Sequence, residues 1–84
     1  MLQFVLKRQY AALLYNIMDS NIIGKTIRTR RKELKTLQDD MAEIAGISPR
    51  TLRDIEKGIA NPELETLLKI CNVLGMEIKV AVIK

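Results

Sequence analysis

Signals that start and stop helices recur at short intervals between residues 36 and 75, and they constrain the fold of this chain more than any other feature. Gly46, Gly58 and Gly75 each follow a stretch with helical spacing of apolar residues, and glycine commonly ends helices in the left-handed conformation. Ser48–Pro49 and Asn61–Pro62 each join an N-cap residue to a proline suited to the first turn. The sequence therefore predicts an all-α fold of four to five short helices joined by tight turns.

The first helix, expected from Asp19 onward, carries most of the positive charge. Its predicted core face is formed by Ile23, Ile27 and Leu34. The whole chain has a net charge of +4, and residues 19–38 contribute six basic and two acidic side chains. By itself such a run equally fits a solvated helix face and a surface that contacts phosphates. Its basic residues are Lys25, Arg28, Arg30, Arg31, Lys32 and Lys35.

The second helix is predicted to begin after Thr36, whose hydroxyl suits an N-cap, with Asp39 at the reciprocal third position of a capping box. Acidic residues in the first turn also suit the positive end of the helix dipole. The expected apolar face consists of Leu37, Met41 and Ile44, and the small Ala42 and Ala45 allow close approach of another helix.

Two further helices follow Gly46. The third starts at Ser48 and Pro49, ends before Gly58 and is anchored on the core through Ile47, Leu52 and Ile55. In the fourth, Asn61 is the predicted cap, Pro62 the first helical residue and Gly75 the end. Its expected apolar positions are Leu64, Leu67, Leu68, Cys71 and Leu74.

The last nine residues, 76–84, change from a helical period to an alternating one. Met76, Ile78, Val80 and Val82 alternate with their neighbours, which predicts a strand. A single strand needs a partner for its backbone donors and acceptors. That partner is either Leu2–Leu6 of the same chain or the same strand of a second subunit. We favour the second arrangement, in which Met76, Ile78, Val80 and Val82 form a β-strand that pairs across a dimer.

Residues 1–18 form an apolar N-terminal segment without a clean period. The segment is too short and too interrupted to span a bilayer, and it lacks the cleavage site of a secretory signal. It is therefore an extra helix, a strand at 2–6, or a stretch upstream of a natural start at Met18. A peripheral membrane role through Lys7 and Arg8 is a weak alternative. The expected organisation is thus residues 1–18, a domain at 19–75 and a dimerisation strand at 76–84.

The composition argues against an enzyme. The chain has no histidine and one cysteine, which excludes histidine-based acid–base catalysis, Ser-His and Cys-His nucleophiles and ordinary zinc sites. We therefore expect no catalytic residue, no metal and no cofactor. Cys71 is expected to be a small core residue, and a single cysteine excludes an internal disulfide.

The run from Leu37 to Gly58, LQDDMAEIAGISPRTLRDIEKG, fits a helix-turn-helix. Ala42 lies where the two helices touch, Gly46 permits the turn, and Ile47, Leu52 and Ile55 hold the second helix. Such a corner can be merely structural. The basic flanks and the exposed surface around Arg50 and Arg53 favour DNA binding instead.

The stretch from Ile23 to Gly75 resembles the lambda-repressor-like (Cro/XRE-type) family of DNA-binding domains. The resemblance implies that Gln38 opens the second helix and binds the DNA backbone. It implies that Pro49, Arg50 and Thr51 face base edges, with Asp54 one turn further on. It also implies an ion pair between Arg31 and Glu56 that braces two helices. One departure is Lys35, Thr36 and Leu37, where the family usually has Gly-Leu-Thr, so that the cap is expected one residue earlier.

The physics of DNA recognition assigns roles to these positions, because phosphate contacts fix the register and base-edge contacts give specificity. Arg50 is the best candidate for a two-point contact with guanine. Asp54 accepts from cytosine or orients a neighbouring arginine, and Arg53 reaches a base or a phosphate; a solvated surface pair of Arg53 and Asp54 is the alternative. The predicted base-reading set is Pro49, Arg50, Thr51, Arg53 and Asp54, and the predicted backbone set is Lys35, Gln38, Lys57, Arg28 and Arg31.

The run from Leu64 to Val82 resembles the end of HipB-like antitoxins, in which a strand after the last helix pairs across the dimer axis. The resemblance implies a cytoplasmic, homodimeric repressor that binds an inverted repeat in double-stranded DNA, regulates its own operon and binds a kinase-like toxin. The alternatives are a stand-alone Cro/XRE-type regulator and a protein-interaction module that has lost DNA binding. The net negative charge of residues 39–57 favours the protein-interaction module.

Overall fold

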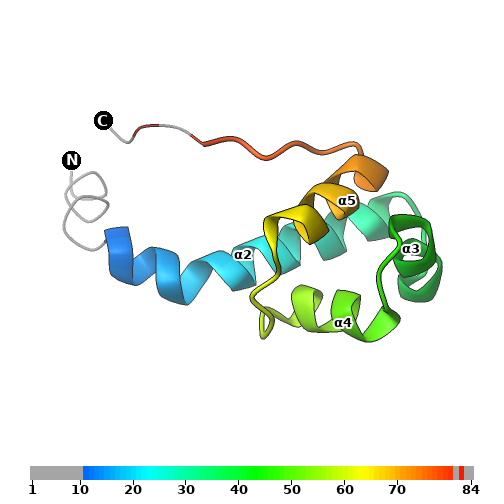
Figure 1. Ribbon diagram of the computed structural model, residues 1–84, viewed down its shortest axis with the longest axis horizontal. Coiled ribbons are helices and arrows are strands. Elements are labelled where there is room, and N and C mark those ends of the chain that lie inside the picture. Colours follow the sequence, from blue (N-terminus) through cyan, green and yellow to red (C-terminus); the bar gives the residue numbers. More distant parts are fainter. Residues whose placement is uncertain (1–10, 81, 83–84) are drawn as a thin grey trace.

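The computed structural model describes residues 11–80 and 82, with side chains from Ser20 onward. This part contains four helices: α2 (Ala11–Glu33), α3 (Gln38–Ala45), α4 (Pro49–Lys57) and α5 (Leu64–Leu74). Figure 1 shows that α2 is the long element of the molecule and that α3, α4 and α5 gather around its C-terminal half. The all-helical architecture predicted from the sequence is confirmed for these residues.

The buried core lies where these four helices meet. Ile27 of α2, Met41 and Ala42 of α3, and Leu52 and Ile55 of α4 are almost completely inaccessible to solvent. Ile70 and Leu74 of α5 complete the core from the other side. Cys71 is also buried, and burial raises the pKa of its thiol. Its expected place in the core is therefore confirmed.

The first helix begins at Ala11 and not at Asp19, so α2 runs without interruption across the boundary expected between residues 18 and 19. Residues 1–10 lie outside the described part of the chain, and so does the possible strand at Leu2–Leu6. At its other end α2 stops at Glu33. Leu34 therefore belongs to the turn, and its side chain is exposed instead of lying on the predicted core face.

The N-cap of α3 is Leu37 and not Thr36. The hydroxyl of Thr36 is bonded within the preceding turn, where it donates to the carbonyl of Leu34 at 3.3 Å. The first α3 hydrogen bond runs from the Met41 N–H to the Leu37 carbonyl at 2.9 Å. Thus α3 begins at Gln38, and the cap shift expected from the departure in sequence does not occur.

Two residues assigned to the apolar face of α3 are on the surface. Leu37 is 70% exposed and Ile44 is 66% exposed. The helix turns a different side inward, because α3 packs against α4 and α5 with Met41, Ala42 and Ala45 buried. The two small residues allow these neighbours to approach, and this contact decides which side of α3 is buried.

The fourth predicted helix is also shifted. Helix α5 begins at Leu64 with Glu63 as its N-cap, so Asn61 and Pro62 lie in the preceding loop. Ile70 is completely buried, whereas Leu64 and Leu68 are exposed. The buried set of α5 is therefore Leu67 in part, then Ile70, Cys71 and Leu74, which follows a regular helical spacing. Packing against α2 and α3 determines which side of α5 is buried.

No strand is formed by the described residues of the C-terminal tail, 76–80 and 82. The tail is extended and runs back alongside α2 (Figure 1). Met76 packs against the core, and Ile78 helps to line a groove with Ile22 and Ile23 of α2, whereas Val80 and Val82 are almost fully exposed. The described residues of the tail thus do not form the predicted strand, and the described part of the chain contains no strand with which they could pair.

Candidate DNA-binding surface

The turn between α3 and α4 has the geometry that the sequence predicts. Gly46 adopts φ 73°, in the left-handed region, and the Ile47 N–H donates to the Ala42 carbonyl at 2.9 Å. Ser48 then caps α4, since its hydroxyl accepts from the Thr51 N–H at 3.1 Å. Pro49 occupies the first turn, as expected. The chain therefore leaves α3 and enters α4 through a short turn that fixes the direction of α4.

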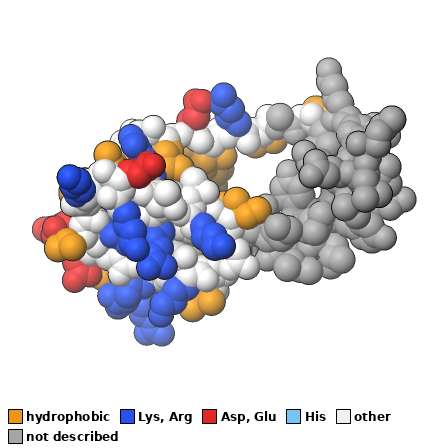
Figure 2. All heavy atoms as spheres, turned by 180° about the vertical axis from the view of Figure 1, so that it is seen from behind, with side chains coloured by type: hydrophobic (Ala, Val, Ile, Leu, Met, Phe, Trp, Pro, Cys, Tyr) orange, Lys and Arg blue, Asp and Glu red, His pale blue; other side chains and the backbone are white. Residues whose placement is uncertain are grey.

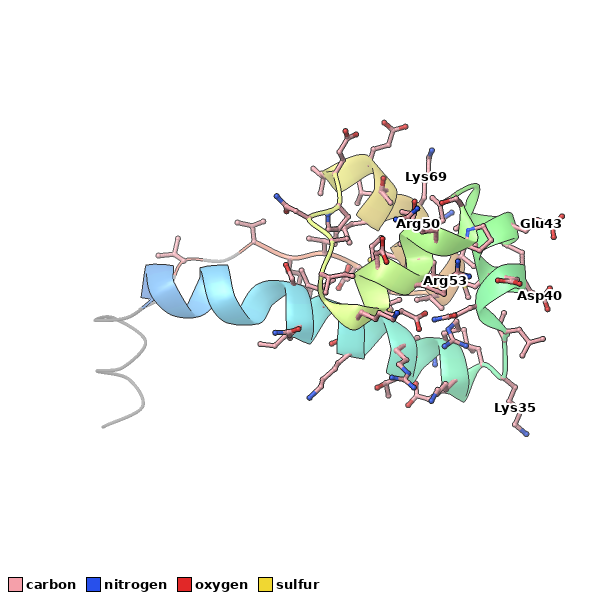
Figure 3. The ribbon with its side chains drawn as sticks, turned by 90° about the horizontal axis from the view of Figure 1, so that it is seen from below. Lys35, Asp40, Glu43, Arg50, Arg53 and Lys69 are labelled. Atoms are coloured by element: carbon pink, nitrogen blue, oxygen red, sulfur yellow. The ribbon has the colours of Figure 1, made fainter. Side chains whose placement is uncertain are left out.

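Helix α4 separates its residues into a buried and an exposed side. Leu52 and Ile55 are buried and hold the helix against α2 and α3. On the opposite side Pro49, Arg50 and Arg53 are exposed. Figure 3 shows the side chains of Arg50 and Arg53 on this helix. Three of the side chains predicted to read bases thus lie on the surface of one helix, and their role in reading bases stays a prediction.

The other two predicted base-reading residues, Thr51 and Asp54, are less exposed to solvent. The hydroxyl of Thr51 lies 2.7 Å from that of Ser48 within the cap, and the residue is only partly exposed. Asp54 is also partly exposed. Arg53 lies 3.9 Å from Asp39 of α3, so its acidic neighbour is not the Asp54 expected from the sequence. Arg50 is consequently the least restrained cation at the start of α4.

A hollow lies beside α4, at the N-terminus of α3. Its lining includes Arg28 of α2, Gln38 of α3, and Arg53 and Lys57 of α4. Leu37, Arg31 and Glu56 complete it. We call this site the α3 hollow. Cationic side chains and the N-terminal amides of a helix together attract anions such as phosphate.

The structure brings four of the five predicted backbone-contacting residues to the α3 hollow: Arg28, Arg31, Gln38 and Lys57. Lys35 lies apart from it, at the turn between α2 and α3, and points away from α4 (Figure 3). Arg53, which was assigned to base reading, also lines the hollow. The surface therefore combines the exposed side of α4 with the adjacent basic α3 hollow.

The floor of the hollow is held by the ion pair that the family resemblance implied. The Nε of Arg31 donates to Oε2 of Glu56 at 2.7 Å, and Nη2 donates to Oε1 at 3.0 Å. The remaining Nη1 donates to the Thr36 carbonyl at 2.8 Å. Both residues are only 7% exposed. Arg31 is therefore a brace between α2, α4 and the turn before α3.

Gln38 joins the same network, since its Nε2 donates to Oε1 of Glu56 at 3.0 Å. Burial raises the pKa of the Glu56 carboxyl, but the hydrogen bonds from Arg31 and Gln38, with the positive charges of Arg31 and Arg28, outweigh burial and lower it. The hydrogen bond to Glu56 in turn raises the pKa of Arg31. The side chain of Gln38 is thereby held in a fixed position at the edge of the hollow.

Gly24 is a residue whose importance the sequence reasoning missed. It lies inside α2, and a Cβ atom at this position would overlap the backbone carbonyl oxygens of Ile55 and Glu56. Glycine therefore allows α2 to lie directly against the C-terminal end of α4. A glycine within a helical pattern was the available signal, because such a residue usually has a packing reason.

Among the described residues, no helix is long and apolar enough to cross a membrane. In the same part of the chain, no group of histidine, cysteine, aspartate and glutamate side chains has the arrangement of a metal site.

Comparison of the chain with known proteins identifies its family. A helix-turn-helix family model matches residues 27–80. An immunity repressor protein of Bacillus phage phi105 is 38% identical over 60 residues, which cover 71% of this chain and 42% of the repressor. The chain therefore spans less than half of that relative.

Two shorter relatives are covered more completely. An HTH-type transcriptional regulator of Haemophilus influenzae is 34% identical over 67 residues, which cover 76% of this chain and 68% of the regulator. The ImmF control region 10 kDa protein of Bacillus phage phi105 is 33% identical over 64 residues, which cover 76% of this chain and 71% of that protein. Since the family model also matches more than half of the chain, this protein belongs to the Cro/XRE-type helix-turn-helix family.

Proposed function

We propose that this protein is a sequence-specific DNA-binding transcriptional repressor that acts in the cytoplasm. The observation that carries the proposal is the position of exposed Pro49, Arg50 and Arg53 on α4 directly beside the basic α3 hollow. Base-edge contacts and phosphate contacts then come from one face of the protein. The names of its relatives, an immunity repressor and HTH-type transcriptional regulators, support the same function.

In the proposed complex α4 enters the major groove and its N-terminal residues meet the base edges. Arg50 forms a two-point contact with a guanine, flanked by Pro49 and Thr51, while Asp54 accepts from a cytosine or orients an arginine. A phosphate occupies the α3 hollow, near Gln38, Arg28 and Lys57. Arg31 acts through Glu56 and Gln38, whose positions it fixes, and Lys35 reaches a phosphate outside the hollow.

We further propose that the active form is a homodimer in which residues 76–84 of two subunits pair as strands. The exposed Val80 and Val82, and the alternation that includes Met76 and Ile78, support this pairing. Two-fold symmetry would place two α4 helices in successive major grooves, about 34 Å apart. Sedimentation of a chain truncated after Gly75 tests the proposal: a monomer is expected, and a dimer would contradict it.

Footprinting on the promoter region of the protein's own gene is the central test of function. A repressor of this kind protects an inverted repeat with half-sites centred about 10 bp apart. Its affinity falls steeply with salt because phosphate contacts release counterions. Binding that is insensitive to salt, without a protected repeat, would favour a protein-interaction module instead.

The narrower role of an antitoxin stays a prediction based on the resemblance of residues 64–82 to HipB-like proteins. It requires a kinase-like partner. Co-purification of the tagged protein with the product of the neighbouring open reading frame tests for such a partner. Without one, the protein is a stand-alone Cro/XRE-type regulator.

A further inference from the structure

The extended tail offers backbone groups to which another strand can bind. The Met76 N–H donates to the Cys71 carbonyl at 2.8 Å, which fixes the start of the tail. Among the described residues, no backbone–backbone hydrogen bond joins residues 77–80 to another part of the chain. Free donors and acceptors along an extended segment are a template for pairing with a second chain.

The side chains of the tail alternate between an apolar side and a charged side. Met76 packs against the core, and Ile78 lines a groove with residues of α2. Because successive side chains of an extended segment point to opposite sides, Glu77 and Lys79 lie together on the other side. Their side chains are exposed, and Lys79 Nζ lies 3.2 Å from Glu77 Oε1.

An open hollow lies between the tail and α5. Two of its apolar side chains remain in contact with solvent, since Leu68 is 50% exposed and Ile78 is 41% exposed. A second strand alongside the tail would remove such apolar surface from water. The lining includes Leu68, Lys69 and Asn72 of α5 and Met76, Glu77 and Ile78 of the tail.

The tail lies on the side of the molecule away from α4. Figure 1 shows the tail above α2 and α4 below it. In Figure 2, which is turned about the vertical axis, most of the basic side chains gather below the level of the tail. A partner bound along the tail therefore need not cover the candidate DNA-binding surface.

A closed pair of identical chains restricts how two tails can meet. Neighbouring strands related by a two-fold axis run antiparallel, and each contact between them occurs twice. The axis has to pass through a residue, because a slip by one position would place the apolar side of one tail on the charged side of the other. The possible centres in the exposed part of the tail are Glu77, Ile78, Lys79 and Val80.

Charge excludes three of these centres. A pair centred on Glu77 or on Lys79 would place that side chain directly opposite its own copy, and like charges in this position are destabilising. A pair centred on Val80 would place Lys84 opposite Met76, which puts a charged residue on the apolar side.

We infer that the tails of two subunits pair antiparallel about a two-fold axis at Ile78. Each Glu77 then lies opposite Lys79 of the partner subunit, so that two ion pairs form on the charged side. On the apolar side Met76 lies opposite the partner's Val80, a residue that is 97% exposed in the single chain. The inference rests on the proposed homodimer, and it names the register, with residues 76–80 as the paired segment.

Disulfide formation between identical positions tests this register. In a pair centred on Ile78 its two Cα atoms lie about 4.5–5.5 Å apart, which is within the range of a disulfide. Ile78→Cys should therefore form a covalent dimer on mild oxidation. The two copies of Val80 are offset by four positions, about 13 Å along the strands, so Val80→Cys should not. The wild type, whose Cys71 is buried, is the control.

Charge variants test the ion pairs separately. Glu77→Lys and Lys79→Glu each place like charges opposite one another, and each should weaken the homodimer about tenfold. An equal mixture of the two variants should form a mixed dimer that is stronger than either homodimer, because opposite charges then meet. Glu43→Lys makes the same change of charge at an exposed position on α3 and should leave the dimer unchanged. Sedimentation equilibrium measures the dimers, and unfolding curves verify that each variant is folded.

Two results would overturn the inferred register while the homodimer stands. One is a covalent dimer of Val80→Cys together with none of Ile78→Cys. The other is a homodimer of both charge variants that is as strong as that of the wild type. If the wild type sediments as a monomer at every concentration, the proposed homodimer itself fails, so the two failures are distinguishable.

Discussion

Arg31 on α2 and Glu56 on α4 form a two-point ion pair inside the protein, with nitrogen–oxygen distances of 2.7 and 3.0 Å. Their residues are separated by 25 positions in sequence. The pair joins α2, which carries more basic residues than any other described helix, to the helix proposed to read DNA. Gln38 binds the same carboxylate, so one buried group positions three elements around the α3 hollow.

The first prediction concerns the removal of one partner from this pair. Arg31→Ala leaves a buried carboxylate without its cation, and should lower the free energy of unfolding by about 3–5 kcal/mol. The double variant Arg31→Met with Glu56→Leu should lose less, because neither charge is left alone. Urea denaturation of the single and double variants measures both effects. Equal losses in the two variants would contradict the role of the pair.

The second prediction concerns pH. Because the pKa of Glu56 in the folded protein lies below its ordinary value of 4.5, the ionised carboxylate stabilises the fold at higher pH. This stabilisation is lost as the pH falls through the folded-state pKa. The free energy of unfolding of the wild type should therefore decrease more steeply below about pH 4.5 than that of Glu56→Gln. Denaturation at a series of pH values compares the two proteins. Parallel curves would exclude Glu56 as the source of the loss of stability at low pH.

The third prediction concerns Lys35, which has φ 54° and ends α2 in the conformation that glycines adopt after α3, α4 and α5. The Thr36 N–H donates to the Arg31 carbonyl at 3.2 Å across this turn. Lys35→Gly should stabilise the protein by about 0.5–1 kcal/mol, since relief of backbone strain exceeds the added entropy of the unfolded chain. Thermal unfolding measures the gain. Lys35→Ala is the control, and an equal gain in that variant would exclude backbone strain.

The fourth prediction concerns Gly24, where a methyl group would overlap the backbone of α4. Gly24→Ala should destabilise the protein by about 1–3 kcal/mol, although alanine favours a helix more than glycine does. Thr29→Ala, at an exposed position of the same helix, should have little effect. Chemical denaturation of both variants checks the contact. A more stable Gly24→Ala protein would show that α2 and α4 do not touch there.

The fifth prediction separates the two kinds of DNA contact. Arg50→Ala should cost about 1–3 kcal/mol of binding free energy and relax the preference at one base position in each half-site. Gln38→Ala should weaken binding to all sequences alike, because its proposed partner is the backbone. Affinities for an operator and its single-base variants measure the difference. An unchanged base preference in Arg50→Ala would remove Arg50 from the base-reading set.

Local signals were sufficient to predict the centre of the helix-turn-helix. Gly46, Ser48 and Pro49 each act within a few residues of themselves, through a left-handed turn, a side-chain cap and a fixed φ. The pairing of Arg31 with Glu56 was also predicted, but only from the family resemblance. No spacing within the sequence indicates that two residues so far apart meet.

The errors in the predicted core of α3 and α5 were made where more than one side of a helix was apolar. Ile44 and Leu68 were assigned to the core, whereas Ile70 was not, and the structure reverses these assignments. In a short helix with several apolar residues, helical spacing allows more than one buried side. Contact with the neighbouring helices selects among them.

The sequence by itself thus determined where helices α3 and α4 end, how the turn between them is built and which side chains are charged, because these properties depend on neighbouring residues. Only the tertiary structure decided which sides are buried, how Gly24 admits α4, and how Arg28, Gln38 and Lys57 come together in the α3 hollow. Those relationships depend on packing between helices that are distant in sequence. The residues that end helices defined the individual helices of this protein, and close packing of those helices formed its candidate DNA-binding surface.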